Sequence, residues 1–234
     1  MKLIAMNNLV PAAPAPARRA FSLVELLIVI SIIGILSAFL MGVMGGVTRT
    51  KTISNARAEM SAIETALERY KAVYGVYPPG NPTNFLVNPL YFELSGTTNN
   101  GLTFSTLDGM NSVLTNNILA SFGVGGFINC SRGSGEDMVP AKVFLPGLKA
   151  NQIGTVTNPV GTPAVAILVS SVRGPDLNYL PLGAPDLNPW RYNSGPTLTN
   201  NPGTYELYIQ LKIGGKTNLI CNWTKQTIVN SPLP

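Results

Sequence analysis

Residues 18–25 read Arg-Arg-Ala-Phe-Ser-Leu-Val-Glu, and the chain then runs without a charged residue from Leu26 to Thr48. An uncharged helix of this length measures roughly 35 Å, which is enough to cross the about 30 Å of hydrocarbon in a bilayer. The sequence therefore predicts a membrane-spanning helix that opens with one carboxylate, Glu25. Because an ionised group at hydrocarbon depth costs about 3 kcal/mol or more, we expect Glu25 to find a partner once the protein is in place.

The helical pattern continues beyond the uncharged segment as a stripe of apolar residues at alternating spacings of three and four, which is typical of one helix face. The stripe consists of Ile53, Ala56, Met60, Ile63, Leu67, Tyr70 and Tyr74. Gly75 and the prolines at 78 and 79 predict the end of this helix. We expect one helix from about Ser22 to Val73, whose stripe packs on a globular domain rather than on a coiled-coil partner, with Glu68 pairing with Lys71.

The remaining residues, 76–234, are enough for one globular domain with its own core. Residues 81–162 are rich in Asn, Gly, Pro, Ser and Thr, and we expect loops there with short helices or strands. Residues 164–172 predict a strand buried on both faces. Residues 205–213 alternate apolar with polar, which predicts a half-buried strand, and Gly214-Gly215 predicts a two-residue hairpin turn into residues 216–221. The expected fold class is α+β, a long helix packed on a C-terminal antiparallel sheet.

A basic leader, a small residue, Phe21 and a glutamate four places later resemble the processing site of type IV pilins and type II secretion pseudopilins. The resemblance implies that a prepilin peptidase cuts between Ala20 and Phe21 and methylates the new amino group of Phe21. Glu25 would then attract the charged terminus of a neighbouring subunit during assembly. The family's usual residue before the cut is glycine, and Ala20 is small enough for a similar pocket. Residues 66–78 resemble the end of the helix in major pseudopilins, where an A-L-x-x-Y-K run leads to Tyr-Pro.

The resemblance also implies an organisation for the chain. Residues 1–20 would be a cytoplasmic leader, 21–48 a transmembrane and assembly helix, 49–75 its amphipathic continuation, and 76–234 a globular domain outside the cytoplasm, which together form the pilin fold. The protein would be a single-pass protein of a bacterial cytoplasmic (inner) membrane before it enters a pilus or pseudopilus filament. Its partners would be other copies of itself, the prepilin peptidase and an inner-membrane assembly platform.

The same N-terminal residues also resemble a twin-arginine export signal, in which a basic pair precedes a cleaved apolar region. Such an apolar region runs for about 7 to 15 residues and is followed by an A-x-A-like cleavage site. Here the apolar region is far longer, and no such site follows it before Arg49. Glu25 at the start of the apolar region is a further departure. The pilin-like interpretation is therefore favoured.

Charge and composition argue against a nucleic-acid partner. The formal charge is +5, but three of the 16 Lys and Arg residues lie in residues 1–20, which leaves 13 basic against 11 acidic residues, a net +2. Arg49, Lys51 and Arg57 could face acidic headgroups or DNA, but an ordinary solvated or interfacial helix turn explains them better. With 45% hydrophobic and 12% charged residues, the chain fits a membrane segment joined to a polar domain.

The chain offers little to catalysis or to metal binding. It contains no histidine, which excludes Ser-His and Cys-His mechanisms and histidine metal sites. Residues 121–126 are glycine-rich but lack the spacing of a phosphate-binding loop. Major pseudopilins resemble one another in an acidic calcium-binding loop, yet no acidic residue follows Glu206, and Asp176 and Asp186 are better explained as turn residues than as ligands. We expect no enzyme activity, no cofactor and no metal.

The two cysteines, Cys130 and Cys221, both fall in the expected exported domain. In an oxidising envelope they could form one disulfide that closes a long loop, or they could remain as two buried thiols. Within the pilin class, a minor, adhesive or DNA-uptake subunit is the first alternative. A membrane-anchored envelope binding module or enzyme is the alternative from a different class.

Overall fold

The computed structural model describes residues 21–133, 138–156, 164–174, 187–196 and 198–230, with the side chains of residues 40–47 not described. Contacts divide the chain into two units, Met1–Gly45 and Gly46–Pro234. The second unit contains every sheet formed by the described residues. Helix and antiparallel strands together make the chain an α+β protein, as the sequence predicts.

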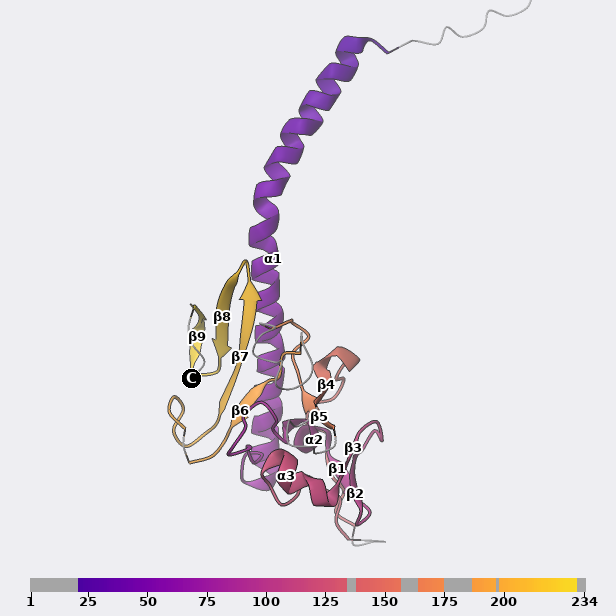
Figure 1. Cartoon of the computed structure of the whole chain (residues 1–234), viewed down its shortest axis with the longest axis vertical. Helices are drawn as coiled ribbons and strands as arrows, with labels where there is room; N and C mark the ends of the chain where they lie inside the picture. The colour runs from indigo at the N-terminus through magenta and orange to yellow at the C-terminus, as the bar shows by residue number, and fades with distance from the viewer. Residues whose placement is uncertain (1–20, 134–137, 157–163, 175–186, 197, 231–234) are drawn as a thin grey trace, which may run out of the picture. The chain divides into compact units, whose positions relative to one another are not determined.

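One helix, α1, spans Leu23–Tyr74 and follows the bounds predicted from the sequence within one residue at either end. Gly75 ends it with φ of +77°, a left-handed conformation that suits glycine, and its N–H donates to the Lys71 carbonyl oxygen at 2.8 Å. Figure 1 shows α1 as the indigo-to-purple ribbon.

The apolar stripe on the second half of α1 is the side that the globular unit covers. Ala56, Ile63, Leu67 and Tyr70 are at most 3% exposed and belong to one large core cluster with residues of the sheets. Fully burying an isoleucine or leucine side chain stabilises the fold by about 1.5 to 3 kcal/mol. The stripe is therefore covered by the chain's own domain, which confirms the prediction of core packing over a coiled coil.

The largest sheet has four antiparallel strands in the order β6 (Arg191–Asn193), β7 (Glu206–Ile213), β8 (Lys216–Cys221) and β9 (Thr224–Val229). Ile213 pairs with Lys216, so only Gly214 and Gly215 connect β7 to β8. Both glycines have positive φ, +58° and +77°, as a type I′ turn requires. The predicted hairpin is confirmed, and Figure 1 shows it running alongside α1.

The polar face of β7 differs from the prediction of a half-buried strand. Glu206 and Gln210 are only 5% and 4% exposed. The Glu206 Oε1 atom accepts hydrogen bonds from the N–H groups of Thr199 and Asn200, so the preceding loop covers the carboxylate. Alternation in the sequence identifies the polar side chains of the strand. It does not reveal that a loop covers one of them and donates hydrogen bonds to it.

Two smaller sheets complete the described fold, so its strands form three sheets rather than the single one expected. The elements are β1 (Thr97–Asn99), β2 (Thr103–Thr106), β3 (Ser112–Leu114), β4 (Ile153–Val156), β5 (Val165–Leu168), the helices α2 (Leu90–Ser95) and α3 (Ile118–Phe122), and 3₁₀ turns at Thr115–Asn117 and Ala150–Gln152. Strands β1 to β3 form one antiparallel sheet and β4 and β5 another. Every residue of β5 is buried, as predicted, although the strand ends at Leu168.

A buried carboxylate, Glu93 of α2, connects three segments of the core. It is 0% exposed. Its Oε2 atom accepts from the Tyr70 hydroxyl at 2.8 Å and from the Asn129 N–H at 2.9 Å, and its Oε1 atom accepts from the Ile128 N–H at 2.9 Å. These bonds tie α1 and α2 to the segment at 128–129. Burial raises the pKa of Glu93, and the hydrogen bonds partly oppose this shift.

The expected Glu68–Lys71 ion pair takes a different form, because both side chains meet at Tyr77. The Tyr77 hydroxyl donates to Glu68 Oε1 at 2.9 Å, and Lys71 Nζ lies 4.3 Å from the centroid of the Tyr77 ring. The chain after Gly75 therefore turns back onto α1 and supplies a partner for each charge.

We predict that Glu93→Gln lowers the free energy of unfolding, by about 1 to 3 kcal/mol, because it leaves a buried N–H without an acceptor. The folded-state pKa of Glu93 lies above its unfolded value near 4.5, so its stabilising contribution is complete below pH 4.5 and is lost as pH rises through the folded-state pKa. The difference in unfolding free energy between the wild type and Glu93→Gln should therefore narrow as pH rises from below 4.5 to 7. Denaturant unfolding of the full chain in detergent, at a series of pH values, measures it.

The control for this experiment is Glu68→Gln, at an exposed carboxylate on α1. A difference between wild type and Glu93→Gln that widens with pH would show that burial does not govern the ionisation of Glu93.

Candidate functional site

In the first turn of α1, Ser22 forms one hydrogen bond with Glu25 and another with Val24. The Ser22 N–H donates to Glu25 Oε2 at 2.9 Å, and the Val24 N–H donates to Ser22 Oγ at 3.3 Å. The Leu26 N–H donates to the Ser22 carbonyl oxygen at 3.2 Å and starts the helical ladder. This arrangement is a variant of the capping box in which Ser22 Oγ accepts from the second rather than the third N–H of the helix. It provides acceptors for N–H groups that a helix start otherwise leaves unpaired.

The capping box gives Glu25 a role that our sequence interpretation missed. The signal was present as Ser22-x-x-Glu25 before an apolar run. Glu25 already has a partner in its own chain, so it does not depend on another molecule for every hydrogen bond. Its second oxygen, Oε1, has no hydrogen-bond partner among the described residues. The site can therefore keep its helix start and still accept a donor from outside the chain.

Around this carboxylate, the apolar side chains of the first part of α1 are exposed. Phe21 is 79% exposed, and the large apolar residues from Leu23 to Phe39 are between 46% and 79% exposed. They lie on every side of the helix, since 100° separates successive residues. An apolar helix surface of this kind is stable only against lipid or against other apolar helices.

Ala20 and the basic pair before it lie outside the described residues, so the predicted cut bond is described on one side only. Phe21 and Ser22 precede the helical residues, which begin at Leu23. Within the part of the chain that the structure describes, no helix is both long and apolar enough to count as a candidate membrane crossing.

The structure does not bring the two cysteines together, and both are free thiols. Asn129, the residue before Cys130, accepts a hydrogen bond from the Tyr74 hydroxyl at 2.7 Å, near the end of α1. Cys221, by contrast, lines a hollow together with Arg57. Arg57 precedes Tyr74 by about 26 Å along the axis of α1. A disulfide requires Cα atoms within about 7 Å of each other, so this bond would need the fold to rearrange.

No metal centre is assembled from the residues that the structure describes. They contain no group of three His, Cys, Asp or Glu residues that could hold an ion. Asp176 and Asp186, the two acids considered as calcium ligands, lie outside the described residues. Burial raises the pKa of the Cys221 thiol, which favours its unreactive protonated form.

The N-terminal segment has a match among known families. The family described as "prokaryotic N-terminal methylation motif" matches residues 16–41. The match includes the basic pair, Phe21, Ser22 and Glu25, while the rest of the 234-residue chain lies outside it. The comparisons with curated proteins and with solved structures gave no match.

We predict that Ser22→Ala frays the first turn of α1, because it removes the oxygen that caps the Val24 N–H. Losing an N-cap serine costs about 1 kcal/mol of local stability. Amide hydrogen exchange of the full chain in detergent should speed up about fivefold at Val24, as that cost implies.

Ser31→Ala is the matched control, because it removes a hydroxyl from the same apolar helix without affecting the cap. The Ser31 hydroxyl donates to the Leu27 carbonyl oxygen within the helix. Equal exchange at Val24 in the wild type and Ser22→Ala would contradict the capping role.

Proposed function

We propose that this chain is a structural subunit that polymerises through its N-terminal helix into a type IV pilus or secretion pseudopilus. Its residues 16–41 are the prepilin-type cleavage and methylation segment of type IV pilins and pseudopilins. Pilins and pseudopilins are structural proteins, not enzymes. The observation that carries the proposal is a capped carboxylate with one unused oxygen at the start of a helix whose apolar side chains are exposed.

The processing step follows from the motif. The prepilin peptidase cuts between Ala20 and Phe21 and methylates the new amino group of Phe21. Phe21 and Ser22 precede the helix, so the new ammonium group begins a short non-helical stretch next to the capping box. The cut thus creates a cation four residues before Glu25 in every subunit.

Assembly then neutralises that cation. The Phe21 ammonium of one subunit binds Glu25 of a neighbour through Oε1, while Oε2 keeps the Ser22 N–H within its own chain. An ion pair in apolar surroundings is favourable only where its charges also find hydrogen bonds, and the capping box supplies one of them. The bonds of the cap therefore orient the carboxylate without consuming its capacity for a neighbour.

The exposed apolar surface of the helix provides the driving force for assembly and determines where the subunit resides before it. Before assembly, we propose, the helix is held in the cytoplasmic membrane as a single pass, with the leader in the cytoplasm and the globular domain outside it. During assembly on an inner-membrane platform, apolar helices of other subunits replace the lipid. The second half of α1, packed on antiparallel sheets, is consistent with the pilin fold and with the organisation 1–20, 21–48, 49–75 and 76–234.

We predict that Glu25→Ala reduces the protein recovered in filaments at least about tenfold, because each subunit then buries an unpaired ammonium group. Processing should continue, so mass spectrometry of the mature protein should still find an N-methylated Phe21 as its first residue. Filaments sheared from the producing cells, quantified against total protein, give the measurement.

Glu68→Ala is the matched control, because it removes an exposed glutamate from the other half of α1. A mature chain that begins at another residue would refute the processing step. Filaments that form equally well with Glu25→Ala would refute the assembly step.

A further inference from the structure

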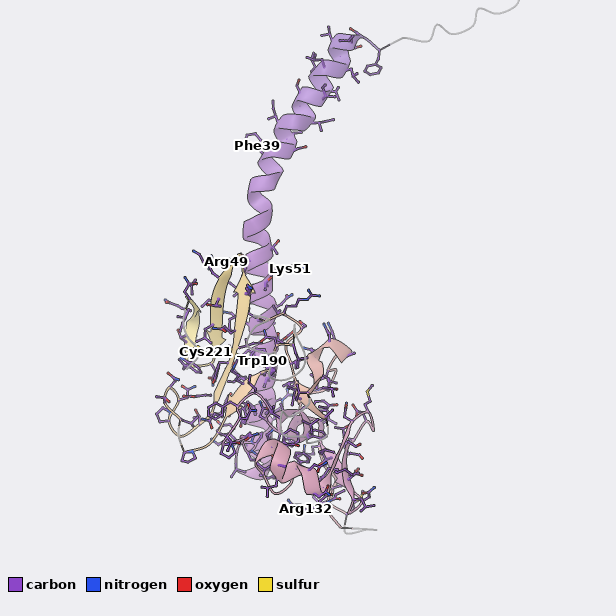
Figure 2. All side chains as sticks on the ribbon, in the orientation of Figure 1. Phe39, Arg49, Lys51, Arg132, Trp190 and Cys221 are labelled. Carbon is purple, nitrogen blue, oxygen red and sulfur yellow. The ribbon has the colours of Figure 1, made fainter. Side chains whose placement is uncertain are left out.

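The second half of α1 borders a groove that the proposed assembly leaves unused. Its apolar part, about 260 Å³, lies between α1 and residues 145–148 and reaches the core at Trp190, which Figure 2 labels. An adjoining polar part of about 270 Å³ is lined by Asn55, Asn151 and Ser171. Ala58, Glu59 and Gln152 line both parts. We call the two parts together the α1 groove.

Glu59 is the fixed acid of the α1 groove. Its Oε2 atom accepts from the Ser170 hydroxyl at 2.7 Å, and its Oε1 atom accepts from the Ser171 hydroxyl and, at 3.3 Å, from the Ser171 N–H. These donors hold the carboxylate in one orientation but are neutral. Among the described residues no lysine or arginine forms an ion pair with it, including Lys149 on the polar wall.

Two cations that have no partner among the described residues precede Glu59 on the same helix. Arg49 and Lys51 are exposed, and Figure 2 shows their side chains extending from α1. Neither has a hydrogen bond or ion pair within the described part of the chain. Arg57, by contrast, donates to the Thr227 hydroxyl at 3.2 Å. Along α1, the exposed positive charges of Arg49 and Lys51 thus precede the half-buried negative charge of Glu59.

These charges cannot pair within one chain. Eight residues separate Lys51 from Glu59, which is about 12 Å along the helix axis and about 80° around it. Side chains on one helix meet at separations of three or four residues, not eight. If a second copy of the chain lies parallel to the first and is shifted along the helix axis, Lys51 of one copy can come level with Glu59 of the other.

We propose that Lys51 of one copy inserts into the α1 groove of a second copy and forms an ion pair with Glu59 there. The inference rests on the proposed function, because it needs parallel copies. The methylene groups of the lysine pack on the exposed Ala58 and Ala62, and its ammonium group reaches the carboxylate. Hydrogen bonds from the two serines keep Glu59 in place, so the lysine pairs with a preorganised acid.

The Phe21–Glu25 pair calls for a displacement in the same direction along the chain. In both pairs the cation precedes the acid along the helix, so one direction of displacement brings both together. Phe21 precedes the helix, so only the Lys51–Glu59 separation, about 12 Å, can be counted along the helix axis. The flexible four-carbon stem of lysine lets this pair form over a range of shifts. Arg49 would need about 15 Å, which is why Lys51 is the assigned partner.

A charge swap in the full chain tests the pair. Lys51→Glu and Glu59→Lys should each lower the yield of sheared filaments about tenfold, because each places like charges together in the groove. The double variant, which restores opposite charges, should recover the yield to within about threefold of the wild type. Arg69→Glu, an equal charge change at an exposed site of α1, is the control and should leave the yield unchanged.

Each alternative outcome decides the matter. If Glu25→Ala abolishes filaments while both single swaps assemble normally, the proposed function stands and the Lys51–Glu59 pair is refuted. If Lys51→Glu lowers the yield but Glu59→Lys does not, the lysine serves an anionic membrane surface and the pair is again refuted. Circular dichroism melting of each variant distinguishes loss of pairing from loss of fold. If the double variant has the melting temperature of the wild type but its filament yield does not recover, the Lys51–Glu59 pair is also refuted.

Discussion

Burial of one face of α1 is the constraint on which the folded unit depends. The buried stripe of α1, which includes Ala56, Ile63, Leu67 and Tyr70, lies in the same core cluster as the residues of β5 and as Leu207, Ile209 and Leu211 of β7. The strands from separate sheets meet on that face, so the helix acts as their common support. Small sheets of two or three strands are marginal alone, and packing on a helix supplies the apolar contact that they lack.

The first part of the same helix meets the opposite condition. Its apolar residues are exposed in the described chain, and no stripe separates a polar from an apolar side. Water is a poor solvent for such a surface, whereas lipid or a bundle of similar helices covers it completely. One continuous helix therefore combines a domain support with a surface that needs other molecules, and this combination underlies the proposed subunit role.

Buried polar groups fix the details of the domain. Glu93 joins α1 and α2 to residues 128–129, and Glu206 holds the loop at 199–200 over β7. A buried carboxylate persists only with such donors, because its desolvation is otherwise too costly. The donors come largely from backbone N–H groups, which every residue carries. Sequence patterns therefore cannot identify them.

The sequence by itself determined the local features: the extent of α1, its buried stripe, the Gly214-Gly215 hairpin and the N-terminal segment with Phe21 and Glu25. Each depends on periodicity, on a turn that requires positive φ, or on a short contiguous motif, all of which residues close in the chain specify. Only the tertiary structure decided the division into three sheets, the covered polar face of β7 and the separation of Cys130 from Cys221. It also placed Ser170 and Ser171 on Glu59. These features join residues far apart in the chain, and their proximity follows from packing rather than from any local pattern.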